Sequence, residues 1–298
     1  MRILITDGMD KSSKDLGYDV IEQFYPPEEL KEEIKNVDIV IVRSATKIRK
    51  DIIDAATETN RLKLVIRGGV GVDNIDVSYA EEKGIQVKNT PLASSISVAE
   101  LTIGHMFSLA RYLYISNVTM REGKWDKKQY EGTELYGKTL GLIGFGRISV
   151  EVAKRAHALG MKVIYTNRSG EKSGYPDYTY TSFDNLISSA DYISIHTPAT
   201  KDNKPLLGEA EFNYMKDGVF IIDCARGGII DEEALIVALD SCKVAGAALD
   251  VFEKEPTTNE RLYKHEKVSL SPHIGGSTKE AQGRIGEEIV SIVKNYKN

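Results

Sequence analysis

Residues 139–149 read TLGLIGFGRIS, an apolar strand pattern that runs directly into a glycine-rich turn and then into a helical pattern. A turn of this kind is the phosphate-binding element of dinucleotide-binding folds. Gly144 would form the tight turn, and Gly146 would let a pyrophosphate approach the backbone. The amides that open the next helix, near Arg147 and Ile148, would then hold the phosphate with the help of the helix dipole.

By itself this glycine pattern is weak evidence, because strand–turn–helix units also use glycine for purely structural reasons. Its third position holds Ser149 instead of glycine, and a small residue there still permits the helix to pack on the strand. The position of the turn within a longer series of strands and helices favours the dinucleotide-binding interpretation.

Short apolar runs alternate with longer amphipathic stretches from end to end, which predicts crossover connections and parallel sheets covered on both faces. The strands expected in a first sheet are Arg2–Thr6, Ile39–Val42, Leu64–Arg67 and Gln86–Lys88. The helices expected beside them are Pro27–Lys35, Lys50–Ala56 and Ser78–Lys83. Strands that suit a doubly wound dinucleotide-binding sheet are Thr139–Ile143, Lys162–Thr166, Tyr192–His196, Val219–Asp223, Ala245–Leu249 and Val268–Leu270.

Two further segments have a helical pattern. One long apolar pattern covers residues 94–120, and a last helix is expected over 279–296, after the final strand. This last helix would pack back on the N-terminal domain and make that domain discontinuous. We therefore predict an α/β fold with two doubly wound parallel-sheet domains, the larger of them a Rossmann domain.

Composition excludes several classes of function. The 298 residues suffice for two domains, and a net charge of −5 without a basic stripe argues against a nucleic-acid partner. Cys224 and Cys242 give neither a disulfide framework nor a metal-binding spacing, which fits a reducing cytosol. The N-terminus lacks the apolar run of a signal peptide, and the apolar runs are strand-sized. We expect a soluble cytoplasmic protein without a metal and without a membrane partner.

The end of the second expected Rossmann strand bears on the cofactor. An acid usually binds the adenosine ribose there, whereas this sequence has Asn167, Arg168 and Ser169. Arg168 could meet the 2′-phosphate of NADP, or it could be a solvated turn residue that stacks on adenine. We expect NAD as the cofactor, with NADP possible.

Three side chains capable of chemistry each come shortly after an expected strand: Arg226, Glu255 and His273. Ligands of open α/β sheets bind outside the carboxyl ends of the strands. An arginine fork suits a substrate carboxylate, and a histidine oriented by a carboxylate suits the removal of a hydroxyl proton. A structural role would be the better interpretation of any one of them alone. Together they predict hydride transfer to or from a 2-hydroxy acid.

Strings along nearly the whole chain carry a resemblance to a known family: VRSATK (42–47), RGGVGVDNID (67–76), GKTLGLIGFGRI (137–148), IDCARGGIIDEEAL (222–235), AALDVFEKEP (247–256) and SPHIGGSTKEAQ (271–282). The chain closely resembles the D-2-hydroxyacid dehydrogenases. The resemblance implies a discontinuous, flavodoxin-like substrate-binding domain, residues 1–92 with 279–298. It also implies a nucleotide-binding Rossmann domain over 93–278, whose long helix near 94–120 forms a homodimer interface.

The resemblance also implies roles for the site residues. Arg226 would bind the substrate carboxylate and 2-oxygen, His273 would be the acid/base, and Glu255 would be its partner. Asp250 would meet the nicotinamide carboxamide. Further residues expected along the cofactor are His196, Thr197, Pro198, Ala225, Gly275 and Gly276.

VRSATK and the HIGGSTKEAQ segment point to the branch of the family that oxidises 3-phospho-D-glycerate to 3-phosphohydroxypyruvate in serine biosynthesis. A phosphate requires cationic groups, and Arg43 with Ser44 is placed for it after an N-terminal strand. Alternatively, Arg43 simply pairs with a neighbouring acid. Arg67 is a second candidate for the substrate's charged end, together with Gly68 and Gly69, and the backbone amides of Gly68 to Gly71 could form an anion nest.

Other interpretations stay open. An NADPH-dependent glyoxylate or hydroxypyruvate reductase would suit Asn167, Arg168 and Ser169, and the same fold occurs in dinucleotide-sensing corepressors that bind protein motifs. Regulatory members of the family carry a C-terminal serine-sensing domain. Because the sequence ends at Asn298, directly after the expected last helix, we expect no serine feedback through such a domain.

Overall fold

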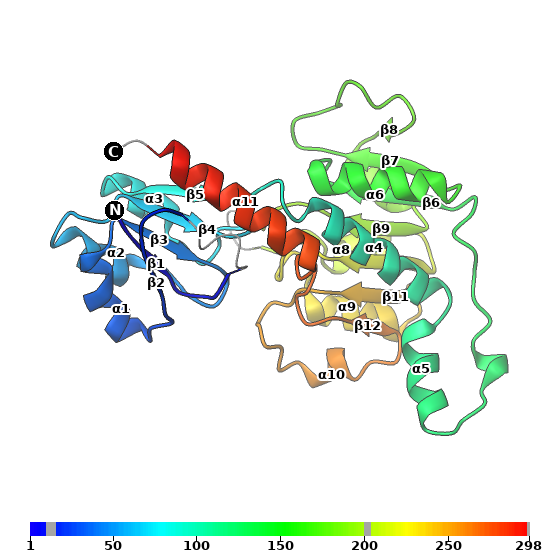
Figure 1. Cartoon of the computed structure of the whole chain (residues 1–298). Helices are drawn as coiled ribbons and strands as arrows, with labels where there is room; N and C mark the ends of the chain where they lie inside the picture. The colour runs from blue at the N-terminus through cyan, green and yellow to red at the C-terminus, as the bar shows by residue number, and fades with distance from the viewer. Residues whose placement is uncertain (10–15, 200–203, 297–298) are drawn as a thin grey trace. The chain divides into compact units, whose positions relative to one another are not determined.

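The computed structural model describes residues 1–9, 16–199 and 204–296. The chain divides into two compact units (Figure 1). The first unit is Met1–Ser95 with Gly276–Asn298, and the second is Ile96–Gly275. The substrate-binding domain was expected to comprise residues 1–92 and 279–298. The first unit of the structure instead ends at residue 95 and resumes at residue 276.

The first unit is built on a five-stranded sheet in the order β2-β1-β3-β4-β5, with every pair parallel. Its strands are β1 (Arg2–Ile5), β2 (Asp19–Glu22), β3 (Ile39–Val42), β4 (Leu64–Arg67) and β5 (Gln86–Asn89). The sequence prediction missed β2, a partly exposed edge strand with an acid at each end. The order reverses direction between β1 and β3, which is the topological switch point of a flavodoxin-like sheet.

Helices cover both faces of this sheet. One face carries α1 (Pro27–Glu33), which continues as the 3₁₀ helix η2 (Ile34–Asn36), together with α2 (Lys50–Thr57) and α3 (Val77–Glu82). The other face carries α11 (Lys279–Asn295), which buries Ile285, Ile289 and Val293 against the sheet. The last helix therefore belongs to the first unit, although almost two hundred residues separate it from the strands it covers.

The second unit contains a seven-stranded parallel sheet in the order β12-β11-β10-β9-β6-β7-β8. Its strands are β6 (Thr139–Ile143), β7 (Lys162–Thr166), β8 (Thr179–Tyr180), β9 (Tyr192–Ile195), β10 (Val219–Asp223), β11 (Val244–Leu249) and β12 (Val268–Leu270). The six expected strands all form. The seventh, β8, is a two-residue exposed edge strand that is too short to produce a sequence pattern.

This sheet also has two helical layers, visible on its two faces in Figure 1. One layer contains α4 (Ser95–Ala110) and α6 (Arg147–Ala158). The other contains α7 (Phe183–Ser189), α8 (Glu209–Tyr214) and α9 (Glu232–Asp240), with the short α10 (Glu260–Tyr263) beside them. The structure confirms the predicted α/β class with two parallel sheets, the larger of Rossmann type.

The expectation of one long helix over 94–120 was wrong. The helix ends at Ala110, and α5 (Leu113–Arg121) begins after Tyr112, whose φ of 53° lies in the left-handed region. The amide of Thr133 donates to the Ala110 carbonyl at 2.9 Å, so a segment distant in sequence takes the carbonyl at the break. Among the helices of the described residues, none is long and apolar enough to cross a membrane.

Candidate active site

The three expected catalytic side chains follow three neighbouring strands of the larger sheet. Arg226 comes after β10, Glu255 after β11 and His273 after β12, and these strands are adjacent in the order β12-β11-β10. Because the strands are parallel, all three loops leave the same edge of the sheet. The topology therefore brings together residues that are 47 positions apart in the sequence, from 226 to 273.

His273 and Glu255 are in direct contact. The Nδ1 atom of His273 lies 2.7 Å from Oε2 of Glu255, and the side chains are 44% and 38% exposed. A carboxylate can only accept, so Nδ1 carries the hydrogen and Nε2 remains available at the surface for proton exchange. The other carboxylate oxygen of Glu255 accepts from the Phe252 amide at 3.2 Å, which fixes its orientation.

The turn that carries His273 is held by Asp250. Its Oδ1 atom accepts from the Ser271 hydroxyl at 2.6 Å and from the Ile274 amide at 2.8 Å, and Oδ2 accepts from the Gly275 amide at 2.8 Å. His273 itself has a φ of 52°, a left-handed conformation that requires such support. Asp250, expected to meet a nicotinamide carboxamide, thus has a structural task as well, and Oδ2 retains one acceptor position.

A buried histidine extends this network. Because the Ser271 hydroxyl donates to Asp250, it accepts from Nε2 of His105 in α4, at 2.9 Å. Nδ1 of His105 then accepts from Ser269 at 3.4 Å. Burial lowers the pKa of His105, against the opposing effect of the Asp250 charge, so the ring is neutral. His105 therefore links α4 to the turn of His273.

The loop that carries Arg226 packs closely on the loop that carries Glu255. A Cβ atom on Gly227 would lie 1.7 Å from the Phe252 carbonyl oxygen, so only glycine fits there. The Arg226 side chain is half-buried, and its Nη1 donates to the Ala225 carbonyl at 2.5 Å. This glycine contact fixes the backbone spacing between two of the three functional loops.

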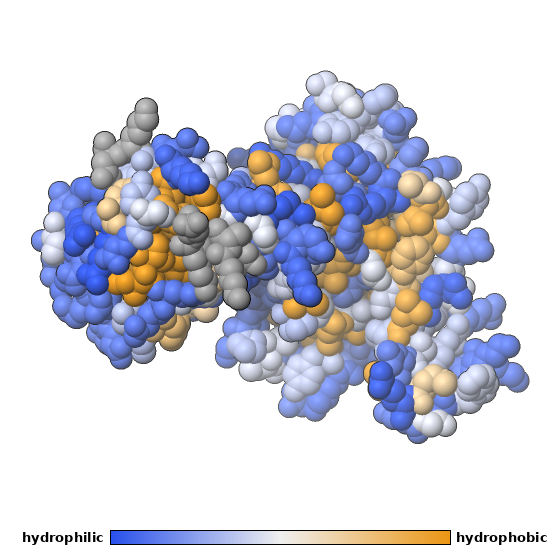
Figure 2. Space-filling model, in the orientation of Figure 1, coloured by the Kyte–Doolittle hydropathy of each residue, from blue (hydrophilic) through white to orange (hydrophobic). Residues whose placement is uncertain are grey.

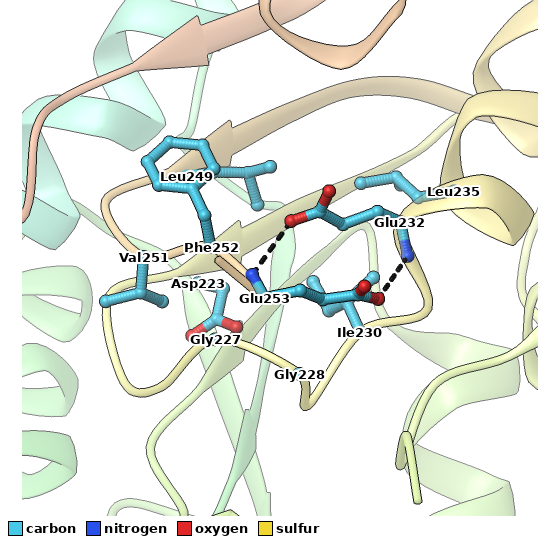
Figure 3. Close-up of a pocket in the computed structure, with 10 residues that line it drawn as sticks. All are labelled: Asp223, Gly227, Gly228, Ile230, Glu232, Leu235, Leu249, Val251, Phe252 and Glu253. Atoms are coloured by element: carbon cyan, nitrogen blue, oxygen red, sulfur yellow. Dashed lines mark hydrogen bonds between the residues drawn. The ribbon is translucent and has the colours of Figure 1, made fainter. Parts of the chain in front are cut away.

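Two glutamates join the same loops further along (Figure 3). The Glu253 amide donates to Glu232 Oε1 at 2.9 Å, and the Glu232 amide donates to Glu253 Oε1 at 3.3 Å. Glu232 also accepts from the Asn259 side chain at 3.1 Å. The cavity between these loops, about 10 Å³, has room for about one water molecule and is too small for a substrate.

Asp223 is an ionisable group that the sequence reasoning did not single out. It ends β10 and is buried, and its Oδ1 accepts from the Ala225 amide at 2.8 Å. Burial raises the pKa of Asp223 to about 7, although the Ala225 and Arg226 amides and the Arg226 charge oppose this. Burial likewise raises the pKa of the neighbouring Cys224 thiol, so this cysteine is an inert thiol near neutrality.

The glycine turn has the geometry that a dinucleotide requires. Gly144 has a φ of 87°, and a Cβ atom there would lie 2.6 Å from the His196 carbonyl oxygen. Gly146 precedes α6, and apart from its two chain neighbours no described residue has an atom within 4 Å of the position that its Cβ would take. Ser149 donates to the Gly144 carbonyl at 2.7 Å. The open space before the first amides of α6, residues Arg147 and Ile148, therefore suits a bound pyrophosphate.

The residues after β9 lie against this turn. Thr197 would contact a Cβ on Gly144 at 2.7 Å, and the neighbouring His196 bonds Ser194 through Nε2 at 2.9 Å. Burial lowers the pKa of His196 to about 3, and its Nδ1 is buried without a hydrogen-bond partner among the described residues. Pro198 follows as an exposed residue. Of the expected cofactor residues, His196 and Thr197 are thus next to the glycine turn.

The end of β7 carries no carboxylate. The Asn167 side chain donates to Ser169 at 2.8 Å and to the Gly170 carbonyl at 3.3 Å, which closes a local turn, and Arg168 is exposed at its tip. Of the other expected cofactor residues, Ala225 is buried. A Cβ atom on Gly275 would lie 3.1 Å from the Asp250 carboxylate, and one on Gly276 would contact the Ser94 side chain.

The expected phosphate-binding residues lie in the first unit, after β3 and β4. Arg43 is half-buried, Ser44 is exposed, and within residues 1–9, 16–199 and 204–296 the Arg43 guanidinium forms no ion pair. The Arg67 side chain folds over Gly69, with Nη1 3.3 Å from the Gly68 carbonyl.

The anion nest expected from Gly68 onward needs a correction. The Gly68 amide already donates to Val42 and the Gly69 amide to Arg67, at 2.8 and 2.9 Å. A nest in this turn would therefore have to use the amides of Val70 and Gly71. In the described part of the chain, His, Cys, Asp and Glu side chains form no group of three that could hold a metal ion.

Comparison with known proteins places this geometry in a family. Residues 103–275 match the sequence profile described as D-isomer specific 2-hydroxyacid dehydrogenase, NAD binding domain. A hydroxypyruvate reductase of Thermotoga maritima is 46% identical over 300 residues, which cover 98% of this chain and 97% of the relative. A D-3-phosphoglycerate dehydrogenase of Rattus norvegicus is 45% identical over 295 residues, which cover 97% of this chain and 55% of the relative.

The chain thus spans about half the length of that dehydrogenase. The crystal structure of a glyoxylate reductase from Paecilomyes thermophila has a TM-score of 0.89 and 32% identity, with 99% of this chain and 96% of that chain covered. The chain belongs to the D-isomer specific 2-hydroxyacid dehydrogenase family. It is accordingly an oxidoreductase of small 2-hydroxy acids that uses NAD.

Several supporting residues were not predicted from the sequence. In the second unit, Ser271, Glu232 and Glu253 hold the loops after β10 to β12 through hydrogen bonds. In the first unit, Asp7 and Asn74 hold the loop after β3. A polar residue shortly after a strand was the available signal for Asp7. Nothing in the sequence indicates which distant loop each of these side chains would hold.

Proposed function

We propose that the chain catalyses the reversible oxidation of 3-phospho-D-glycerate to 3-phosphohydroxypyruvate with NAD. The contact between His273 and Glu255, beside the loop of Arg226, carries the dehydrogenase part of the proposal. Arg43, a half-buried cation without an ion pair among the described residues, supports a phosphorylated substrate. The phosphoglycerate dehydrogenase among the relatives supports the same choice.

In this proposal each residue has one task. NAD, when bound, accepts the hydride from carbon two of the substrate. Nε2 of His273 takes the hydroxyl proton, and Glu255 stabilises the imidazolium that results. Arg226 binds the carboxylate and, in the reverse direction, polarises the keto oxygen. Arg43 and Ser44 bind the phosphate. In the reverse direction, protonated His273 returns its proton to the oxygen.

The residues proposed to hold the cofactor begin with the glycine turn. The amides of Arg147 and Ile148 would bind the pyrophosphate beside Gly144 and Gly146. The remaining cofactor contacts proposed are Asn167, Arg168, His196, Thr197, Pro198, Ala225, Asp250, Gly275 and Gly276.

A second candidate is an NADPH-dependent glyoxylate or hydroxypyruvate reductase. Two observations favour it. The hydroxypyruvate reductase of Thermotoga maritima matches over 97% of its own length. The exposed Arg168, in a turn without a carboxylate, would suit a 2′-phosphate.

Initial rates of reduction separate these candidates. The substrates are phosphohydroxypyruvate, hydroxypyruvate and glyoxylate, each tested with NADH and with NADPH. We expect the highest kcat/KM for phosphohydroxypyruvate with NADH. A preference for an unphosphorylated acid would move the chain to the reductase branch. Absence of turnover with all three would contradict both candidates.

We also propose a homodimer that uses α4 and α5. Leu113, Val118 and Met120 are 54%, 51% and 52% exposed on α5, and orange hydrophobic patches occur in Figure 2 where Figure 1 places these helices. Light scattering at micromolar concentration should give twice the mass of the 33.0 kDa chain. A Val118→Glu variant should give the monomer mass, and a monomeric wild-type protein would contradict the proposal.

A further inference from the structure

The switch point of the smaller sheet places two side chains together. The strand order reverses between β1 and β3, and ligands of open α/β sheets bind outside the carboxyl ends of the strands at such a point. Asp7 follows β1 by two residues, and Arg43 follows β3 directly. The loop of residues 43–46 thus begins where this sheet is expected to receive a ligand.

Asp7 binds both ends of the 43–46 loop through its carboxylate. Oδ2 accepts from the Arg43 amide at 2.6 Å and from the Thr46 amide at 3.0 Å. Oδ1 accepts from the Thr46 hydroxyl. Three donors therefore surround one carboxylate, and they come from the first and last residues of the loop.

Asn74 binds the same two residues through their carbonyl groups. Its Nδ2 atom donates to the Arg43 carbonyl at 2.7 Å and to the Thr46 carbonyl at 2.6 Å. Both backbone groups of Arg43 and both of Thr46 are therefore bonded by only two side chains, Asp7 and Asn74. Between these fixed points, Ser44 and Ala45 remain exposed.

These hydrogen bonds fix the backbone of the 43–46 loop without using the guanidinium of Arg43. Thr46 is 4% exposed, so its amide and carbonyl could not easily exchange these bonds for water. Arg43 keeps its guanidinium free of ion pairs among the described residues, although its backbone is bonded on both sides. A cation on a fixed backbone loses less conformational entropy on binding an anion than one on a mobile loop.

We propose that Asp7 and Asn74 are positioning residues for substrate selection: they hold the 43–46 loop so that Arg43 and Ser44 meet the phosphate of the substrate. This inference rests on the proposed function, in which Arg43 and Ser44 bind that phosphate. A displacement of about 1 Å in such a loop is enough to weaken binding strongly. Loss of Asp7 or Asn74 should therefore raise the KM of the phosphorylated substrate while kcat is retained.

The test measures kcat and KM for phosphohydroxypyruvate and for hydroxypyruvate with NADH. Asp7→Ala should raise the KM of phosphohydroxypyruvate about tenfold or more. This rise corresponds to the binding free energy of one or two hydrogen bonds. The KM of hydroxypyruvate and both kcat values should change less than about twofold, because hydroxypyruvate has no phosphate to misplace. Asn74→Asp, which sets a carboxylate against two carbonyls, should act in the same direction.

Asp7→Asn is the conservative variant that should rescue binding. An asparagine there can still accept from both amides with its oxygen and can donate to the Thr46 hydroxyl with its nitrogen. If Asp7→Ala does not fold, Thr46→Val is a milder variant that removes one bond to Asp7, and Thr46→Ser is its matched control because it keeps the hydroxyl.

Asp38 supplies a structural control in the same unit. It accepts from the Arg2 amide at 2.6 Å and from Arg61 Nε at 3.0 Å, at the amino ends of the strands. Asp38→Ala should lower the Tm as Asp7→Ala does, yet leave both KM values unchanged, because it bonds no residue of the 43–46 loop.

The outcomes separate this inference from the proposed function. If Arg43→Ala selectively weakens the phosphorylated substrate and Asp7→Ala does too, the inference holds. If Arg43→Ala is selective but Asp7→Ala, Asn74→Asp and Thr46→Val affect both substrates equally or neither, the inference is overturned and the proposed function stands. If Arg43→Ala is not selective, the proposed function itself fails.

Discussion

The loops after β10 to β12 in the larger unit and the 43–46 loop in the smaller unit solve a similar problem in different ways. Each lies at the carboxyl ends of parallel strands, and each is held by a carboxylate that accepts backbone amides: Asp250 in one case and Asp7 in the other. The functional side chain His273 is itself paired, with Glu255 at 2.7 Å. Arg43, in contrast, has no ion pair among the described residues.

This difference corresponds to two kinds of task. The proton transfer proposed for His273 requires a base whose tautomer and orientation are set before the substrate arrives, and the bond to Glu255 supplies both. The phosphate recognition proposed for Arg43 requires a cation that is not already neutralised, and Arg43 is held through its backbone alone. Changes in the first region should lower kcat for every substrate, and changes in the second should raise KM for one.

The largest effect is expected at His273. His273→Ala removes the proposed acid/base, and kcat should fall by about 10³-fold for phosphohydroxypyruvate and for hydroxypyruvate alike. The measurement is steady-state reduction of both acids with NADH. A variant that retained more than about a tenth of the activity would break the proposed division of tasks.

Glu255→Gln tests whether the pairing itself matters. It preserves the shape but removes the charge and the fixed acceptor, so kcat should fall by about 10²-fold. A fall of less than about twofold would mean that the 2.7 Å contact only orients the ring.

The sequence predicted most of this architecture because apolar runs and glycine turns are local signals. It missed β2 and β8, which are edge strands with partly or fully exposed residues. It also joined α4 to α5, because the apolar helical pattern continues through the break at Tyr112. At that break the amide of the distant Thr133 bonds the Ala110 carbonyl. Arg226, Glu255 and His273 could be proposed as site residues because each follows a strand.

The supporting contacts could not be predicted. The bonds from Asp7 and Asn74 to the 43–46 loop join residues separated by 28 to 39 positions. Asp250, expected at the nicotinamide, also proved to hold the turn of His273. Which polar side chain meets which loop depends on the packing of strands whose register the sequence does not specify.

Arg168 offers a smaller test of the same comparison, because it too is a cation proposed to recognise a phosphate, although it is exposed where Arg43 is half-buried. Arg168→Asp would place a carboxylate where NAD-specific enzymes bind the ribose. The ratio of kcat/KM for NADPH to that for NADH should fall about tenfold, with kcat unchanged. If the ratio does not change, the Arg168 side chain does not reach the adenosine ribose.

The smallest effect is expected at Asp223, which lies in the first region but bears on stability. Its pKa of about 7 exceeds the ordinary value of 3.8, so the folded state binds the proton more tightly than the unfolded state does. Stability is therefore lost as the pH rises from about 4 to about 7. Asp223→Asn removes this loss. Its gain in Tm over the wild type should therefore be larger at pH 8 than at pH 5, and each kcal/mol of stability gained corresponds to about 2–4 °C in Tm.

The most direct test of the division of tasks compares Arg43→Ala with His273→Ala in one experiment. The quantity measured is the ratio of kcat/KM for phosphohydroxypyruvate to that for hydroxypyruvate, with NADH. We expect Arg43→Ala to lower this ratio about tenfold or more while kcat for hydroxypyruvate is retained, and His273→Ala to lower both activities with the ratio unchanged. An unchanged ratio in Arg43→Ala would contradict the account.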